Sequence, residues 1–309
     1  MSYKLHSGIN REPNQNELAD FWEVECLKRT DRSASVLDVR KARGIADDIQ
    51  ETDDDDVVDI KFEEVDQSAA EELTRRIKGC NGRYPFNLKS PGHNLVFTPL
   101  NDQAEFGYLF LLIATRSNMR DNKVHDGIDG TLLFEEVCAL VLRRFLGQRS
   151  KSFVFGTGSD GGFVASLEKL RSELREITLH PPLASDTYPP QDDKLDVVAW
   201  IPFTDELPSK LMCFAQSKTG TGWQKYTTQL TIEGFATRWF SRQPAIKAIP
   251  TFMITDSVIA GDFHHRAAPN LLFDRCRMAE YMDFSGEEEL FSRVIKWTKA
   301  ALLHHKISV

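Results

Sequence analysis

The chain has 309 residues, of which 41% are apolar and 27% are charged. These proportions are ordinary for a globular protein that buries one large core or two smaller ones. No apolar run approaches the roughly 20 residues that a membrane-spanning helix needs, so we expect no association with a membrane.

The net charge is −8, and the negative charge lies mostly in the first third of the chain. Residues 1–100 hold 14 Lys and Arg against 20 Asp and Glu. Free-standing proteins that bind nucleic acid tightly are usually basic, because contacts with phosphates supply most of their affinity. The charge therefore argues against such a protein, but it permits an enzyme with a local basic groove or one that a partner delivers to its substrate.

The five cysteines are an odd number, are widely spaced and include no C-x-x-C. This pattern favours free thiols in a reducing compartment over disulfides or a zinc site. The first residues contain no apolar region of the kind found in signal peptides. We therefore expect a cytoplasmic location.

The first hundred residues predict a small α+β module. Hydrophobic periodicity predicts helices over residues 17–28, 35–49 and 68–78, and strands over residues 57–62 and 94–99. The acidic run at residues 51–56 is expected to be a solvated loop. Because no motif for chemistry occurs here, we predict an accessory or partner-binding module over residues 1–100.

The remaining residues, 101–309, predict an α/β domain, although a boundary near residue 125 fits equally well. Predicted helices cover residues 104–115, 131–145, 163–177, 223–230, 270–282 and 287–304, and predicted strands cover residues 151–155, 195–203, 210–218 and 249–255. No internal repeat is found.

Residues 195–218 contain the strongest candidate site. Asp196 opens one apolar run, and Gln216-Ser217-Lys218 closes the next after a turn-rich joint. If the two strands are antiparallel neighbours, Asp196, Gln216 and Lys218 meet at one edge of the sheet. Ser217 would point to the other face, because side chains alternate along a strand.

Two further acids lie in the first turns of the helix predicted at residues 131–145. Glu135 and Glu136 stand among apolar residues that follow the helical period. They are either solvated and favoured by the positive end of the helix, or directed at a site.

The order of these elements and residues resembles the PD-(D/E)XK, or restriction-endonuclease-like, nuclease superfamily. Three segments carry the resemblance: Gly130-x-x-x-Phe134-Glu135, Leu195-Asp196-Val197-Val198, and Gln216-Ser217-Lys218. The last is similar to the Q-x-K signature of the Mrr-like branch. The resemblance covers about residues 131–260, with the helix at residues 163–177 as an insertion.

The resemblance implies a mixed central sheet flanked by helices and a Mg²⁺-dependent endonuclease that hydrolyses DNA phosphodiesters, with Mn²⁺ as a substitute metal. Glu135, Asp196 and Gln216 would hold the metal, and Lys218 would orient the attacking water or stabilise developing charge. It also implies a bacterial role in restriction or anti-phage defence, with a helicase, ATPase or regulatory subunit as partner; a homo-oligomer is also compatible with it.

Three residues that open the helix after the signature are candidates for contact with the DNA backbone. These are Trp223, Gln224 and Lys225. Packing in the core is an equally good interpretation of Trp223.

Two other interpretations stay open. Gly156, Gly158 and Gly161 form a G-x-G-x-x-G between a strand and a helix, and residues 156–162 could serve a nucleotide-binding enzyme. No acid follows about 20 residues later, as that motif requires. Asp160 in the same turn competes with Asp196 as the central acid. A nuclease fold that has lost its activity and serves as an interaction protein is the other alternative, since Gln216 is neutral.

Overall fold

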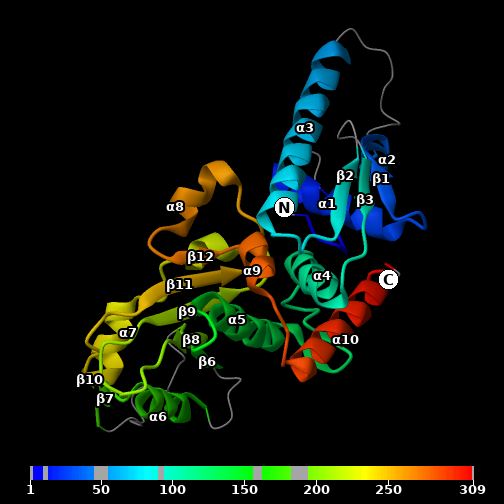
Figure 1. Ribbon diagram of the computed structural model, residues 1–309. Helices are drawn as coiled ribbons and strands as arrows, with labels where there is room; N and C mark the ends of the chain where they lie inside the picture. The colour runs from blue at the N-terminus through cyan, green and yellow to red at the C-terminus, as the bar shows by residue number, and fades with distance from the viewer. Residues whose placement is uncertain are drawn as a thin grey trace.

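The computed structural model describes residues 3–9, 13–44, 55–89, 94–155, 162–181 and 194–307. Figure 1 shows a central sheet with its helices and, above it, an N-terminal lobe from which helix α3 (Asp55–Gly79) projects. Helix α10 (Glu288–His304) packs along α4 (Asp102–Arg116) near the C-terminus. The predicted mixture of helices and strands is confirmed.

The N-terminal lobe contains three helices and a small antiparallel sheet in the order β1-β3-β2. Its other elements are α1 (Gln15–Lys28), β1 (Ser33–Ser35), α2 (Val36–Ala42), β2 (Phe86–Lys89) and β3 (Asn94–Phe97). Helix α1 starts at Asn14, whose side chain and that of Glu17 each accept a hydrogen bond from the other residue's backbone N–H.

The second part of the chain carries the main sheet and its helices. After α4 come β4 (Val124–His125), β5 (Ile128–Asp129), α5 (Gly130–Leu146), β6 (Lys151–Val154), α6 (Gly162–Leu174), β7 (Thr178–Leu179), β8 (Val197–Trp200), β9 (Met212–Lys218), the 3₁₀ helix η1 (Trp223–Tyr226), α7 (Ile232–Trp239), β10 (Phe240–Arg242), β11 (Ile249–Ile254), the 3₁₀ helix η2 (Ala260–Asp262), α8 (Phe263–Ala267), β12 (Leu271–Phe273), α9 (Arg275–Tyr281) and α10.

The main sheet has five strands in the order β12-β11-β9-β8-β6. β6, β8 and β9 form an antiparallel meander, whereas β11 and β12 run parallel to β9. The carboxyl ends of β9, β11 and β12 therefore meet the start of β8 at one edge of the sheet. We call this edge, which includes Asp196, Lys218, Asp256 and Asp274, the carboxyl edge.

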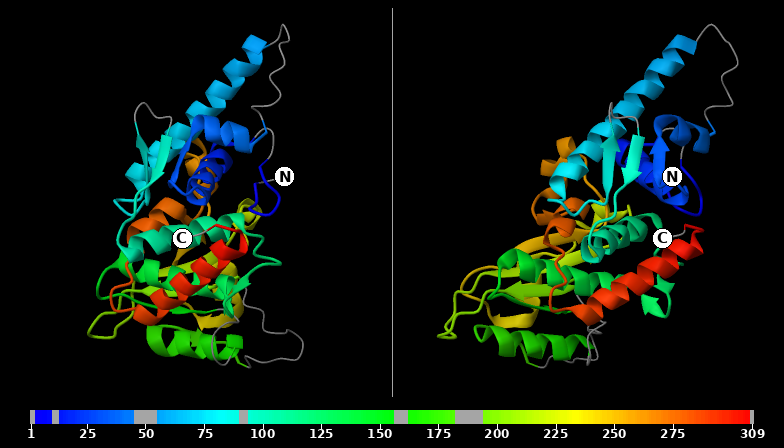
Figure 2. Two further views of the ribbon diagram at one scale, coloured as in Figure 1. Left: turned by 90° about the vertical axis from the view of Figure 1, so that its right-hand side faces the viewer. Right: turned by 45° about the vertical axis from the view of Figure 1, so that its right-hand side comes forward.

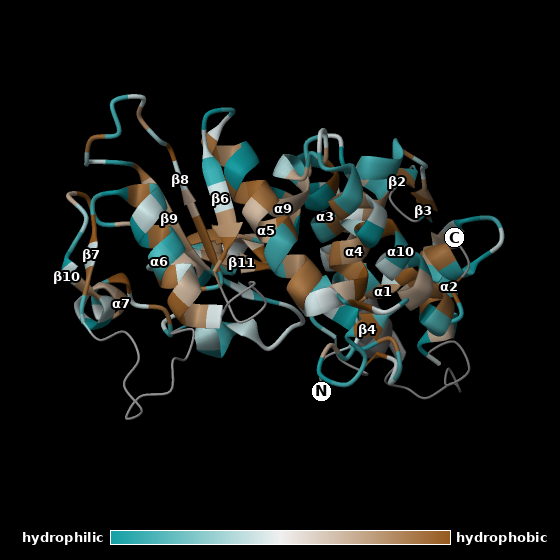
Figure 3. Ribbon diagram, turned by 90° about the horizontal axis from the view of Figure 1, so that it is seen from below, coloured by the Kyte–Doolittle hydropathy of each residue, from teal (hydrophilic) through white to brown (hydrophobic). Residues whose placement is uncertain are grey.

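Both faces of the main sheet are covered, which explains why β8 and the first half of β9 are apolar on both faces (Figure 3). One face packs on α5 through Val197, Ala199, Cys213 and Ala215. The other face packs on α6 and α7 through Val198, Trp200, Met212 and Phe214. Figure 2 shows α6 on the side of the sheet away from the N-terminal lobe.

The two predicted domains share one hydrophobic core. Trp22 of α1 and Leu73 of α3 belong to the same buried cluster as Phe110 of α4 and Trp297 of α10. Near residue 100, where a domain boundary was expected, the small N-terminal sheet ends and helix α4 begins. The buried cluster contains residues from both sides of this position.

Four secondary-structure predictions were wrong. Asp55 and Asp56, the end of the acidic run expected to be a loop, are the first residues of α3. Residues 57–62 lie inside α3, because Val58 and Phe62 also stand at the helical spacing that continues to Ala69 and Leu73. The helix predicted at residues 270–282 begins with strand β12 and becomes helical only at Arg275. The helix predicted at residues 223–230 is the short η1, and α7 follows it.

Several other predicted elements were confirmed, among them the helix at residues 131–145 and the strands at residues 151–155 and 249–255. Residues 45–49 and 51–54, which carry parts of a predicted helix and of the acidic loop, lie outside the described residues. Within the described ranges, no helix combines the length and apolar character that crossing a bilayer requires.

Candidate functional site

Asp196 lies at the carboxyl edge, one residue before β8. Its backbone N–H donates to the Ala215 carbonyl (2.9 Å), and its own carbonyl accepts from the N–H of Phe155 (2.7 Å). These bonds continue the pairing of β8 with both of its neighbours. The predicted antiparallel pairing of the two central strands is confirmed, and it sets Asp196 beside the end of β9.

The Asp196 carboxylate is held by the middle residue of the Gln216-Ser217-Lys218 segment, so the expectation that Ser217 points away from Asp196 was wrong. Its Oδ2 atom accepts from the Ser217 N–H (2.7 Å) and from Ser217 Oγ (3.2 Å). Asp196 is 6% exposed, so both bonds lie away from bulk water. Ser217 thus fixes one of the two carboxylate oxygens of Asp196.

Glu135 reaches the same region from α5. Cys138, one turn further along this helix, has a thiol whose pKa is raised well above its ordinary value by burial and, to a smaller extent, by the carboxylates of Asp196 and Glu135. Both carboxylates are therefore close enough to Cys138 to act on its thiol. The structure brings the helix acid and the strand acid into one neighbourhood.

The position of α5 depends on the glycine that begins it. A Cβ atom on Gly130 would lie 2.5 Å from the ring of Trp297 in α10, so only glycine permits this contact. The Asp129 side chain caps the helix by accepting from the Thr131 N–H (2.8 Å). Gly130, the first residue of the segment that carries the resemblance, has a packing role here.

Glu136 has a different partner. Its carboxylate forms a two-pronged ion pair with Arg293 of α10, with one bond of 2.7 Å from Nη1 to Oε1. This pair lies on the α10 side of α5, so Glu136 does not replace Glu135 as the acid of the site.

Gln216 is fully buried at the end of β9. Its Nε2 donates to Gln229 Oε1 (3.3 Å), which orients the amide. Its Oε1 atom is buried and accepts no hydrogen bond from any residue that the structure describes. A buried acceptor without a partner costs about 1–3 kcal/mol, so this oxygen is available to a ligand.

Lys218 ends β9 at the carboxyl edge. Its ammonium lies 5.7 Å from the centre of the Tyr226 ring. Within the described residues it forms no ion pair with a carboxylate. Its positive charge is therefore not committed to a neighbouring acid.

These residues form a donor set of two carboxylates and one amide oxygen. Among the described residues, no three His, Cys, Asp or Glu side chains come together as a metal-binding group. A site built from Glu135, Asp196 and Gln216 contains only two such side chains. The unpartnered oxygen of Gln216 would be the third donor of such a site, and oxygen donors suit Mg²⁺ and Mn²⁺.

The three candidate DNA contacts lie in different surroundings. Trp223 is buried against Phe252, so the structure places it in the core. Gln224 and Lys225 are exposed, and the Lys225 ammonium lies 5.0 Å from the centre of the Tyr226 ring. Only these last two are available to a nucleic acid.

The glycine-rich turn offers no test of the nucleotide-binding alternative. Residues 156–161, with Gly156, Gly158, Asp160 and Gly161, lie outside the described residues. Gly162, which is described, begins α6 with a φ of 74°.

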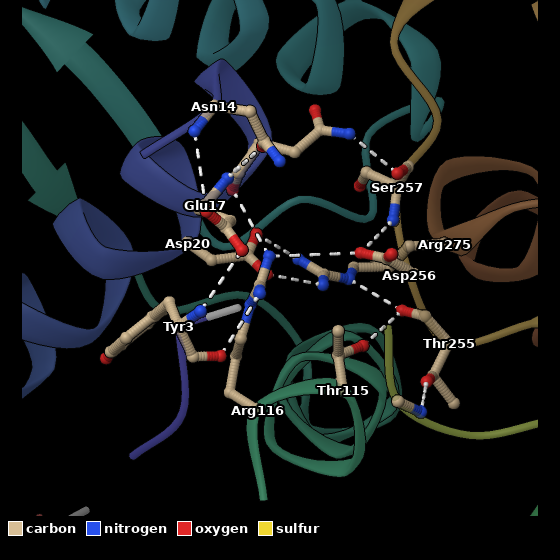
Figure 4. A network of polar contacts seen from close by, with 12 residues as sticks. Tyr3, Asn14, Glu17, Asp20, Thr115, Arg116, Thr255, Asp256, Ser257 and Arg275 are labelled. Atoms are coloured by element: carbon tan, nitrogen blue, oxygen red, sulfur yellow. Dashed lines mark hydrogen bonds and ion pairs between the residues drawn. The ribbon is translucent and has the colours of Figure 1, made fainter. Parts of the chain in front are cut away.

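A second polar group at the carboxyl edge was not predicted from the sequence (Figure 4). Asp256 follows β11 and accepts from the indole N–H of the buried Trp223 (3.0 Å). Behind it, Asp20 of α1 binds Arg116 of α4 (2.5 Å) and Arg275 of α9 (2.7 Å). The spacing of these residues, up to 255 positions apart, carries no signal in the sequence.

The pKa values of the two acids in this group, Asp256 and Asp20, are shifted in opposite directions. Burial raises the pKa of Asp256, and Arg116 offsets this only in part. Burial also acts on Asp20, but Arg116, Arg275 and Arg76 outweigh it and hold the pKa of that carboxyl well below its usual range. Asp20 is therefore the negative centre of the network that joins the N-terminal lobe to the sheet.

Comparison of the chain with protein-family models, with curated proteins and with solved structures gave no match. The site is therefore interpreted from its own residues and geometry.

Proposed function

We propose that this protein is a metal-dependent deoxyribonuclease of the PD-(D/E)XK type, an endonuclease that hydrolyses DNA phosphodiesters with Mg²⁺ or, as a substitute, Mn²⁺. The observation that carries the proposal is that Asp196, Gln216 and Lys218 all lie where the paired strands β8 and β9 meet the carboxyl edge, with Gln216 Oε1 buried and unpartnered among the described residues.

The order of the elements supports the proposal. α5, β6, β8, β9, α7 and β11 follow one another as helix, three antiparallel strands, helix and a strand parallel to the third. This is the arrangement expected of a restriction-endonuclease-like core, with α6 as an insertion and the N-terminal lobe as an addition.

Each residue has a chemical role in the proposal. Asp196, Glu135 and Gln216 Oε1 would hold the metal, which when bound would neutralise phosphate charge and activate a water. Ser217 would keep the Asp196 carboxylate in place through its two hydrogen bonds. Lys218 would orient the attacking water or stabilise charge that develops on the phosphate.

The setting of the activity is part of the proposal. We infer a cytoplasmic enzyme of bacterial restriction or anti-phage defence, because the five cysteines are free and buried and because the resemblance implies that role. The net charge of −8 favours a partner that brings the enzyme to DNA, such as a helicase, ATPase or regulatory subunit.

Cleavage of plasmid and linear DNA tests this proposal. The purified chain is incubated with Mg²⁺, Mn²⁺ or EDTA, beside Asp196→Asn and Lys218→Ala. The matched controls are Asp205→Asn and Lys169→Ala, which change an exposed acid and an exposed lysine away from the site. We expect metal-dependent cutting that both site variants lose and both controls keep. Cutting that survives Asp196→Asn and Lys218→Ala would remove these residues from the mechanism.

A second candidate is a nuclease fold that binds a protein partner without catalysis. The neutral Gln216 and the absence of a three-acid group among the described residues favour it. Calorimetric titration with Mn²⁺ separates the two: the nuclease binds Mn²⁺ and Asp196→Asn does not, whereas the interaction protein shows no binding in either form.

A further inference from the structure

A pocket of about 380 Å³ opens at the carboxyl edge, between the start of α1 and the end of β11. It lies beside the candidate site, because Thr255, which leads into the pocket, donates its N–H to the Lys218 carbonyl (3.4 Å). Its volume falls within the range of about 300–1,000 Å³ that is usual for small-molecule sites.

The floor of the pocket is rich in hydrogen-bond acceptors. Asp256 lies there with its side chain 10% exposed. Asn16, from α1, donates its Nδ2 to the Ser257 carbonyl (2.7 Å), which fixes the orientation of the amide. Asn16 Oδ1 is buried and has no hydrogen-bond partner among the described residues.

The hydroxyl of Ser257 has the same property. Ser257 is 2% exposed and lines the pocket, and its Oγ has no hydrogen-bond partner in the described part of the chain. Two buried polar atoms from separate elements, Asn16 Oδ1 and Ser257 Oγ, are thus unsatisfied at one pocket. Native proteins rarely leave such atoms unpaired, so their coincidence indicates a ligand that approaches them.

The charged side chains that line the pocket are paired with one another or with neighbouring groups, so the pocket does not favour an ionic ligand. Arg116 is paired with Asp20, and Arg266 lies 3.7 Å from Asp262, so the two guanidiniums are committed to carboxylates. Glu17 accepts from the backbone N–H of Tyr3 (3.1 Å) and caps α1. The lining therefore suits a neutral molecule that donates hydrogen bonds.

The walls suit a flat ring. Trp223, Val258 and Ile259 contribute apolar side chains to the lining of the pocket. Gln224 is exposed at the rim and can reach a second edge of the ligand. An aromatic ring that carries N–H donors meets both the apolar walls and the acceptor floor.

We propose that this pocket binds a nucleobase that carries an exocyclic amine, with the amine directed at Asp256, Asn16 and Ser257. Such a base has two sources. The first is a free nucleoside. The second, which rests on the proposed nuclease function, is a DNA substrate whose base is extruded beside the cleavage site.

Equilibrium binding by calorimetry, in EDTA to prevent cleavage, tests the proposal on the full chain. The ligands are adenosine, guanosine, cytidine and thymidine, followed by short single-stranded oligonucleotides that carry adenine and cytosine, only thymine, or abasic sites. The variants are Ser257→Ala, which removes an unpaired hydroxyl, and Gln224→Ala at the exposed rim. Ser172→Ala, on the exposed face of α6, is the matched control.

We expect ligands with an amine to bind at least about tenfold more tightly than their thymine counterparts, and Ser257→Ala and Gln224→Ala to weaken binding about three- to tenfold. Binding of nucleosides identifies a free ligand, whereas binding of amine-bearing oligonucleotides alone identifies a base of DNA. Equal binding of thymine ligands, no binding of any ligand, or unchanged binding by both variants would overturn the proposal.

DNA cleavage measured on the same proteins separates the two proposals. Metal-dependent cutting without base-dependent binding defeats the pocket alone. Base binding without cutting defeats the nuclease and leaves the pocket standing.

Discussion

Ser217 holds Asp196 through two hydrogen bonds to the same carboxylate oxygen, one from its backbone N–H at 2.7 Å and one from its hydroxyl at 3.2 Å. The residue between Gln216 and Lys218 thus positions the acid of the neighbouring strand. In the proposed nuclease, this contact links the two central strands into one site.

The two hydrogen bonds predict different effects for two substitutions. Ser217→Ala keeps the backbone bond and loses the hydroxyl bond, so we expect DNA cleavage to fall about tenfold. Asp196→Asn removes a metal ligand, so we expect a loss of about 100-fold or more. Initial rates at increasing Mg²⁺ concentration check this, because excess Mg²⁺ should restore Ser217→Ala but leave Asp196→Asn inactive. Equal rates for the two variants would contradict the assignment.

If Gln216 is a metal ligand, the free energy of unfolding of a Gln216→Glu variant should depend on bound metal. Gln216→Glu places a carboxylate at a fully buried position, so in EDTA we expect it to destabilise the fold by about 3 kcal/mol. With Mn²⁺ at about 100 times its Kd, binding should return about 2.7 kcal/mol. Urea denaturation with and without Mn²⁺ measures both values.

Gln216→Leu is the matched control, because it fills the same space without a ligand oxygen. Its stability should not respond to Mn²⁺ at the concentration that rescues Gln216→Glu. A Gln216→Glu protein that Mn²⁺ fails to stabilise would show that this position does not face a metal.

The ion pairs of Asp20 join the N-terminal lobe to the rest of the chain, so we expect both to unfold together. Asp20→Asn leaves Arg116 and Arg275 without their buried partner, so we expect a loss of about 3–5 kcal/mol. Because the core is continuous, the wild type should show one cooperative transition in urea, reported alike by tryptophan fluorescence and circular dichroism. The exposed Asp205→Asn should be neutral. Two separated transitions would show that residues 1–100 fold as an independent domain.

Because the pKa of His305 is lowered in the folded protein, we expect the protein to lose stability in acid. Burial, and then the neighbouring charges of His304 and His125, lower its pKa from 6.5 to about 4. Between these two pH values the unfolded chain binds a proton that the folded chain does not, so stability falls as the pH falls. Further charges that act in the same direction come from His6 and Lys28.

The measurement is the melting temperature at pH 7.5 and pH 5 for the wild type and His305→Gln. The variant should lose less than the wild type. Buried acids with raised pKa values, such as Glu23 and Asp256, act in the opposite direction, but they are common to both proteins and cancel in the comparison. His264→Gln, at an exposed position, should behave like the wild type. Identical losses for His305→Gln and the wild type would contradict the account.

Local patterns were sufficient to predict the centre of the molecule. The apolar runs around Asp196 and Gln216 are bounded by turn residues, and both become strands because each is buried on two faces. The periodicity of α5 likewise predicted the helix that carries Glu135. These features depend on residues close together in the sequence.

The remaining features depend on contacts that local patterns do not contain. The strand β12 was missed because Leu271 and Phe273 become extended only by pairing with β11. The role of Asp256 was missed because its partners, Trp223 and Arg116, come from other elements. The alternation of apolar and polar residues that suggested a strand at residues 57–62 was overridden by the longer helical period of α3.

The most direct test of the central claim is a crystal structure of the protein with Mn²⁺, with the ion located by its anomalous scattering. The account predicts one peak about 2.0–2.3 Å from an Asp196 carboxylate oxygen and from Gln216 Oε1, with Glu135 bound directly or through a water. An anomalous map with no peak at Asp196, or a peak at other residues only, would contradict it.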